Sequence, residues 1–160
     1  MTAPGRAIVL STPEDTLRFG RRLGAMLLAG DLVLLAGPLG AGKTLLTKGI
    51  AAGMQVDGLV TSPTFVIARV HRATVSGRPS LVHVDAYRLA GALELDDLDL
   101  DTDLTASAVV VEWGEGRAEQ LARDHLVVRL TRQDDDSRLA ELIGTGPPWH
   151  QRIRKLAGAR

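Results

Sequence analysis

The stretch Gly37-Pro38-Leu39-Gly40-Ala41-Gly42-Lys43-Thr44 fits the pattern G-x-x-x-x-G-K-[ST]. The residues just before it, 32–36, are continuously apolar, as in a strand buried on both faces of a parallel sheet. From Thr44 to about Ala52 the apolar spacing predicts a helix that ends at Gly53. A buried strand, a glycine-rich loop and a helix in this order are the context in which the pattern binds nucleotide phosphates.

The physical chemistry of this loop suits phosphate groups. Successive backbone N–H groups surround the phosphate oxygens, and the dipole of the following helix favours their negative charge. Lys43 is expected to bridge the β- and γ-phosphates of ATP, and the hydroxyl of Thr44 is expected to bind Mg²⁺. We therefore predict that residues 37–44 contact Mg-ATP.

Composition restricts the class of protein. A chain of 160 residues with 45% hydrophobic content predicts one globular domain. The 19 basic and 19 acidic residues cancel, which excludes a global electrostatic attraction to nucleic acid or to an anionic membrane. The absence of cysteine excludes a disulfide framework and a thiolate metal site. The apolar runs are too short to cross a bilayer and the start has no apolar leader, so we expect a soluble, cytoplasmic protein.

Helices and strands are predicted on both sides of the phosphate loop. Thr12 can cap a helix that begins at Pro13 and that we expect to end at Ala29. Residues 65–70 and 81–85 predict two strands that form an antiparallel hairpin. The N-terminal half therefore alternates strands and helices.

The C-terminal half contributes further strands. Residues 108–111 predict a buried strand, and residues 126–130 alternate less cleanly, as an edge strand does. Residues 93–104 mix leucines with aspartates and predict a short helix with an acidic exposed face. We expect an α/β fold, a three-layer P-loop NTPase domain with a mostly parallel sheet and some antiparallel strands. This domain is assigned to residues 1–146, and residues 147–160 are expected to form a mobile basic tail.

Three short polar segments stand at the ends of predicted strands, where the sites of α/β sheets collect. They are Ser62-Pro63-Thr64-Phe65 before one strand, His83-Val84-Asp85-Ala86-Tyr87-Arg88-Leu89 after another, and Glu112-Trp113-Gly114-Glu115 after a third. A phosphate loop alone does not choose among kinases, switches and motors. These three segments are therefore needed to identify the class of P-loop protein.

Together with the phosphate loop, these segments resemble the bacterial TsaE (YjeE) family, the ATPase component of tRNA threonylcarbamoyladenosine biosynthesis. That family shows a Gly-x-Leu-Gly-Ala-Gly-Lys-Thr loop, a Ser-Pro-Thr-aromatic element, a His-x-Asp-x-Tyr-Arg element and a Glu-Trp pair. All four occur here in this order. The resemblance covers about residues 11–138 and not the basic tail. Pro38 departs from the acidic residue usual at its position, so we expect altered loop stiffness and retained binding.

The resemblance implies ATP binding and slow, Mg²⁺-dependent hydrolysis that supports transfer of a threonylcarbamoyl group to the adenosine next to the tRNA anticodon. It also implies two protein partners, TsaD, the transferase subunit, and TsaB. Contact with tRNA is then indirect, through the complex. A partner is expected to stimulate the weak ATPase activity, because no arginine finger is identifiable in the sequence.

The resemblance also assigns roles to single residues. Glu112 is implied as the second protein ligand of Mg²⁺ beside Thr44, and Asp85 as a ligand of Mg²⁺ or as the group that orients water. Lys43, Asp85 and Thr64 are the predicted catalytic residues. Thr64 is expected to distinguish bound ATP from bound ADP, as the switch loops of other nucleotide-binding proteins do. Trp113 is either a core side chain or a lid and partner contact.

Three further residues complete the predicted nucleotide site. The resemblance implies that Thr12 and Arg138 border the adenosine, and Glu115 is counted among the nucleotide-binding residues. The plainer alternatives are that Asp85 and Glu112 are acids at the exits of strands and that Thr64 only begins one. His83 is interpreted as a structural residue.

Three other functions stay open at this point. A small-molecule kinase would need a second pocket and a lid that carries arginine, for which the chain has few residues to spare. A non-catalytic, ATP-gated binding module would use the same loop and carboxylates. A direct RNA binder is poorly supported, because the net charge is zero and aromatic residues make up only 3% of the chain.

Overall fold

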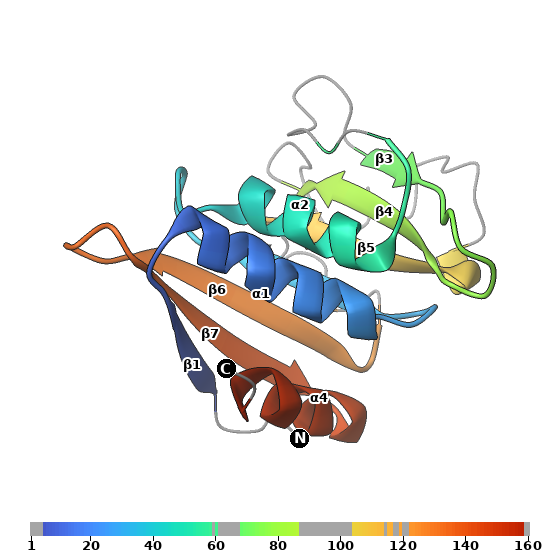
Figure 1. Ribbon diagram of the computed structural model, residues 1–160. Helices are drawn as coiled ribbons and strands as arrows, with labels where there is room; N and C mark the ends of the chain where they lie inside the picture. The colour runs from blue at the N-terminus through green and yellow to red at the C-terminus, as the bar shows by residue number, and fades with distance from the viewer. Residues whose placement is uncertain are drawn as a thin grey trace.

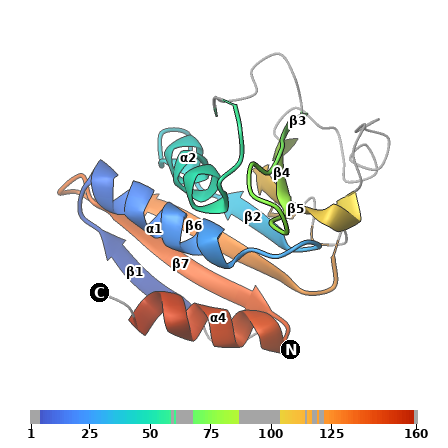
Figure 2. The same ribbon diagram turned by 45° about the vertical axis from the view of Figure 1, so that its right-hand side comes forward.

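The computed structural model describes residues 5–58, 60, 68–86, 104–113, 115–116, 119 and 122–158. In chain order the elements are β1 (Arg6–Leu10), α1 (Pro13–Met26), β2 (Leu32–Ala36), α2 (Lys43–Met54), β3 (Ala68–His71), β4 (Ser80–Asp85), η2 (Leu104–Ala106), β5 (Ser107–Glu112), β6 (His125–Arg132), β7 (Arg138–Thr145) and α4 (Pro147–Gly158). The seven strands form one sheet with the order β1-β7-β6-β2-β5-β4-β3 (Figures 1 and 2). None of the helices in these ranges is long and apolar enough to span a membrane.

The centre of the sheet is parallel and its flanks are antiparallel. Strands β6, β2, β5 and β4 run parallel to one another. Strands β7 and β1 on one side, and β3 on the other, join by antiparallel pairing. The expectation of a mostly parallel sheet is therefore correct only for these four strands, and the sheet as a whole is mixed. The carboxyl ends of β2, β4 and β5 lie at one edge, where sites of such sheets form.

The three described α-helices lie on one face of the sheet. Helices α1 and α2 lie side by side across its middle, and α4 packs on β7 and β1 (Figures 1 and 2). One core cluster joins Leu23 of α1, Ile50 of α2 and Trp149 of α4 to Val33 of β2. The opposite face carries a second buried cluster that includes Leu34. Within the described residues the helices form a single layer, so the expected three-layer arrangement is not observed there.

Helix α1 begins where the sequence predicts. Thr12 Oγ1 accepts a hydrogen bond from the backbone N–H of Asp15 at 3.1 Å, and Asp15 Oδ2 accepts one from the N–H of Thr12 at 3.2 Å. This reciprocal capping box and Pro13 in the first turn fix the start of the helix. The helix ends at Met26 and not at the expected Ala29.

Strand β7 is not evident in the sequence, and its presence moves β6 into the interior of the sheet. The expectation that residues 126–130 form an edge strand is wrong, because β6 pairs with β2 on one side and with β7 on the other. The β6–β7 hairpin closes with a hydrogen bond from Gln133 N to Ser137 O of 2.8 Å. The other predicted hairpin is confirmed for its described part, since β3 and β4 pair antiparallel.

Residues 147–158 form a helix docked on the sheet, so the expectation of a mobile tail is wrong for them. Trp149, Ile153 and Leu156 recur at helical spacing and are buried, with exposed fractions of 1%, 4% and 1%. Arg152 lies over the ring of Trp149, and its Nη1 donates to Oδ2 of Asp31 at 2.7 Å. The sequence gives only a weak helix signal here, because three apolar residues stand among prolines and basic residues.

Glycines allow helices α1 and α2 to approach closely. A Cβ on Gly24 would lie 2.1 Å from the carbonyl oxygen of Ile50. We expect Gly24→Ala to lower the free energy of unfolding by about 1–3 kcal/mol, because the two helices must move apart. Chemical denaturation measures this change. Gly158→Ala, whose Cβ would meet no atom within 4 Å, is the matched control. A Gly24→Ala variant as stable as this control would contradict the packing described.

Candidate functional site

The loop between β2 and α2 contains three glycines with positive φ angles, Gly37, Gly40 and Gly42. Gly37 and Gly42 have φ angles of 137° and 104°, in the left-handed region. A Cβ on Gly37 would also lie 2.4 Å from the carbonyl oxygen of Leu130 on β6. Gly42 is the N-cap of α2 and offers no side chain to the first turn. The first N–H groups of the helix therefore stay available to an anion.

The ammonium group of Lys43 is held between the loop and an indole ring. Its Nζ donates to the carbonyl oxygens of Gly37 at 2.7 Å and of Pro38 at 2.9 Å. The same atom lies 3.9 Å from the centroid of the Trp113 ring. Lys43 is buried. The structure therefore presents a cation, already oriented by neutral groups, beside the loop.

Two carboxylates from neighbouring strands lie near this cation. Asp85 ends β4, Glu112 ends β5, and the two residues are partners in the register of the parallel pair. Because Ala108 and Val110 of β5 face the helix layer, the two-residue alternation turns Glu112 to the same side. Burial lowers the pKa of Lys43, and the negative charges of Glu112 and Asp85 oppose that shift.

The carboxylate of Glu112 is held from both sides. Thr44 Oγ1 donates to Glu112 Oε1 at 3.1 Å, from the first turn of α2. His83 Nε2 lies 2.5 Å from the other oxygen, Oε2. Glu112 is only 4% exposed and His83 is fully buried. Each carboxylate oxygen thus has its own partner.

One cavity of about 250 Å³ collects most of the predicted site residues. It is lined by Leu39, Gly40, Gly42, Lys43, Thr44, Leu45, Asp85, Glu112 and Trp113. Residues from the phosphate loop, from α2 and from the ends of β4 and β5 therefore meet at one place, as the motifs predict. Thr64 lies outside the described residues, and its role stays a prediction.

Thr44 and Glu112 fit a bound Mg²⁺ ion. Both supply hard oxygen atoms, and the 3.1 Å between Thr44 Oγ1 and Glu112 Oε1 suits neighbouring ligands, which lie about 3 Å apart around an octahedral Mg²⁺. The described residues contain no group of three or more His, Cys, Asp or Glu that could hold a metal ion by itself. This sparse donor set is typical of Mg²⁺, which takes its other ligands from water and substrate phosphates.

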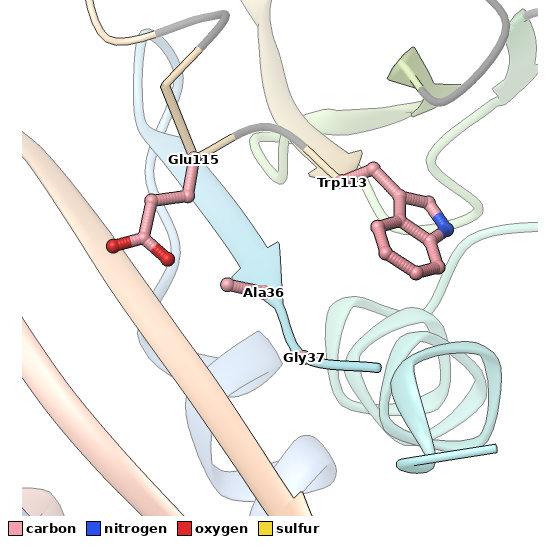
Figure 3. Close-up of a pocket in the computed structure, with 4 residues that line it drawn as sticks. All are labelled: Ala36, Gly37, Trp113 and Glu115. Atoms are coloured by element: carbon pink, nitrogen blue, oxygen red, sulfur yellow. The ribbon is translucent and has the colours of Figure 1, made fainter. Parts of the chain in front are cut away.

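Trp113 and Glu115 lie on opposite sides of the end of β2 (Figure 3). Trp113 has a φ of 62°, which is unusual for a bulky residue. Its backbone N–H donates to the carbonyl oxygen of Leu35 at 2.9 Å. The indole points toward α2 and covers Lys43. Glu115 forms an ion pair with Arg129 of β6. The described residues that line the cavity between them are Ala36, Gly37, Trp113 and Glu115.

Thr12 and Arg138 meet on another side of the phosphate loop. They line a small cavity together with Gly42 and Leu45. Arg138 Nε donates to the carbonyl oxygen of Ala41 at 3.1 Å, so this side chain braces the loop backbone. The hydroxyl of Thr12 is engaged in the cap of α1. The structure brings both residues beside the N-terminus of α2, and their contact with adenosine stays a prediction.

Sequence reasoning treats His83 as structural and misses its contact with Glu112. A signal was present, because His83 stands two residues before Asp85 and therefore faces the same side of β4. The sequence does not indicate the hydrogen bond from Arg138 to the backbone of Ala41, because it does not predict strand β7, on which Arg138 lies. The segments around Thr64 and Arg88 lie outside the described residues.

Comparison with known proteins places the whole region in one family. The family model described as threonylcarbamoyl adenosine biosynthesis protein TsaE matches residues 10–140. A Mycobacterium bovis protein named tRNA threonylcarbamoyladenosine biosynthesis protein TsaE is 58% identical over 143 residues, covering 85% of each chain. Proteins of the same name from Streptomyces coelicolor and Bacillus subtilis are 56% and 34% identical. These two matches cover 81% and 91% of this chain, and 90% and 89% of the relatives.

The fold agrees with a solved structure. The crystal structure of Bacillus subtilis YdiB superposes with a TM-score of 0.78 at 28% identity, covering 99% of this chain and 97% of that one. The family model spans the phosphate loop, the carboxylates at the ends of β4 and β5, and Arg138. The resemblance inferred from the motifs is confirmed: the chain belongs to the TsaE family of tRNA threonylcarbamoyladenosine biosynthesis proteins.

Proposed function

We propose that the protein is a P-loop NTPase that binds Mg-ATP and hydrolyses ATP slowly in support of threonylcarbamoyladenosine formation in tRNA. The observation that carries the proposal is the convergence of Lys43, Thr44, Asp85 and Glu112 on one cavity at the N-terminus of α2. A cation, two oxygen ligands for a metal and a further carboxylate are the groups that phosphoryl transfer to water requires. Membership of the family supports the biosynthetic pathway.

Binding of ATP uses groups that the loop already orients. The phosphates lie against residues 37–42, whose N–H groups and helix dipole favour negative charge. Lys43 exchanges its contacts with the carbonyl oxygens of Gly37 and Pro38 for contacts with the β- and γ-phosphates. Thr12 and Arg138 border the adenosine beside the same helix. Glu115 and Trp113 are adjacent to the first glycine of the loop.

The two carboxylates, Glu112 and Asp85, have different roles in the proposed reaction. Thr44 and Glu112 are the residues that would hold Mg²⁺, which when bound would neutralise negative charge on the phosphate oxygens. Asp85 accepts a hydrogen bond from the attacking water and orients it toward the γ-phosphorus, so that a new P–O bond forms as the bond to the β–γ bridging oxygen breaks. ADP leaves with the bridging oxygen, and the protons of the water remain on the released phosphate. Thr64 is proposed to sense the γ-phosphate from its loop.

Turnover by the protein alone is expected to be slow. No arginine lines the cavity within the described residues, so Lys43 is the positively charged side chain that faces the transferring group there. An arginine finger contributes about 10³–10⁵ in kcat in related phosphoryl transfers. A partner that supplies such a group, or that orders the site, therefore raises the rate.

We assign the partner role to TsaD and TsaB, with tRNA reached through their complex in the cytoplasm. The family name supports the pathway. The zero net charge and the 3% aromatic content support an indirect contact with tRNA, because the chain has no net positive charge to attract phosphates and few aromatic rings on which bases could stack.

The Asp85→Asn variant tests the proposed chemistry. We expect ATP hydrolysis in the presence of TsaD and TsaB to fall by about 100-fold, because the amide orients water poorly, while ATP affinity changes by less than about 3-fold. Steady-state phosphate release and calorimetry measure these two quantities. Asp124→Asn, at the opposite edge of the sheet before β6, is the control. Wild-type hydrolysis by Asp85→Asn would show that the assigned role is wrong.

A further inference from the structure

His83 makes a contact that the proposed chemistry has not yet used. The residue lies in the interior of β4, is fully buried and places Nε2 2.5 Å from Oε2 of Glu112. A carboxylate only accepts hydrogen bonds, so Nε2 carries the hydrogen and donates it. The other ring nitrogen, Nδ1, has no hydrogen-bond partner within the described part of the chain. The polar contact of the ring is therefore directed to one atom of the site.

The two contacts of Glu112 together determine how its carboxylate is turned. Thr44 Oγ1 engages Oε1, and His83 Nε2 engages Oε2. The terminal torsion of a glutamate is otherwise broad, so the carboxylate could rotate within its pocket. With Oε2 held by the histidine, Oε1 stays on the side of α2 and of the cavity.

We infer that His83 is a positioning residue that holds Glu112 so that Oε1, beside Thr44 Oγ1, faces the Mg²⁺ of a bound nucleotide. The inference deepens the proposed function and rests on it, because it requires a metal–nucleotide complex at this cavity. Groups that hold the ligands of a metal commonly change metal affinity by 10–100-fold when they are removed.

A purely structural role for His83 accounts less well for the arrangement. A histidine that only fills space in the core needs no carboxylate beside it, and burying a carboxylate is costly unless it is hydrogen-bonded. The two-residue period of β4 also puts His83 on the same face as Asp85. One strand therefore supplies both the positioning group and a carboxylate of the site.

Three substitutions of His83 separate positioning from packing. His83→Leu keeps an apolar body of similar size and removes the donor. His83→Gln places an amide N–H about where Nε2 lies, and His83→Asn places one where Nδ1 lies, short of Glu112. The probe is a fluorescent, non-hydrolysable ATP analogue, whose binding is followed first in EDTA and then with rising Mg²⁺ concentration.

The expected result is a change in the Mg²⁺ requirement. For His83→Leu the Mg²⁺ concentration that gives half of the metal-dependent signal rises by about 10–100-fold, while metal-free affinity changes by less than about 3-fold. His83→Gln stays within about 3-fold of the wild type because its donor is retained. His125→Leu, the same change at a buried histidine at the start of β6, leaves the Mg²⁺ requirement unchanged.

Several outcomes would overturn the inference. A folded His83→Leu variant with the Mg²⁺ requirement of the wild type would do so, and so would equal losses for His83→Leu and His83→Gln. If His83→Leu does not fold, His83→Asn decides, since it should show the raised Mg²⁺ requirement that His83→Gln lacks. A wild type without any Mg²⁺ dependence would contradict the proposed metal site as well, which distinguishes the two failures.

Discussion

Lys43→Ala is expected to weaken ATP binding by at least about 100-fold, the loss of roughly 3 kcal/mol from two charge-assisted hydrogen bonds to phosphate. The ammonium group is buried beside the loop and its position is set by the carbonyl oxygens of Gly37 and Pro38. No other cation lines the cavity within the described residues. Calorimetric titration with Mg-ATP measures the affinity.

Lys48→Ala is the matched control for this prediction. Lys48 lies on the same helix, carries the same charge and is exposed, so its removal should leave ATP affinity within about 2-fold of the wild type. Wild-type ATP affinity of both Lys43→Ala and Lys48→Ala would show that Lys43 does not bind the phosphates. Equal losses would indicate a non-specific effect of charge and not a site.

Trp149→Ala is expected to lower the free energy of unfolding by about 3–5 kcal/mol, the usual result of truncating a fully buried tryptophan. The indole is 1% exposed and belongs to the core cluster that joins α4 to α1 and the sheet. Arg152 also stacks on it. Denaturation by urea, with the slope compared between variants, measures the change.

Arg154→Ala controls for the loss of a side chain from α4 as such. Arg154 is exposed, so its removal should change the stability by no more than about 0.5 kcal/mol. Should Trp149→Ala also change the stability by so little, residues 147–158 would behave as the mobile tail expected from the sequence. The packing of α4 on the sheet would then be contradicted.

The parts of the fold that depend on local sequence were predictable. The strand before the phosphate loop, the loop and the helix after it follow from apolar runs and from glycine positions within about 20 residues, and β2 occupies residues 32–36 as predicted. The start of α1 was equally clear, because Thr12, Pro13 and Asp15 are local capping signals.

Features that depend on long-range pairing were not predictable in the same way. Strand β7 alternates buried and half-buried positions and contains Gly144, whose lack of a side chain makes room for Trp149 and Ile153. Neither the pattern nor the glycine indicates a strand until α4 is in place. The direction of strand pairing and the single layer of helices depend on contacts between residues that are far apart in the sequence. A short stretch of sequence does not reveal such contacts.

The candidate site shows the same division. Lys43, Thr44, Asp85 and Glu112 could be placed in one cavity, because strands that run parallel bring their carboxyl ends together. The contact between His83 and Glu112 joins two strands across 29 positions of the chain, and no motif reports which oxygen faces which partner. The sequence therefore predicts which residues form the candidate site, but it does not predict how their side chains are oriented relative to one another.

We propose that this cavity binds and hydrolyses ATP as part of the threonylcarbamoyladenosine machinery. The most direct test of this proposal is ATP hydrolysis by the purified protein, alone and with TsaD plus TsaB, for the wild type and for Lys43→Ala. We expect slow turnover alone, faster turnover with the partners, and loss of both in the variant. Turnover that ignores the partners and survives the loss of Lys43 would contradict the proposal.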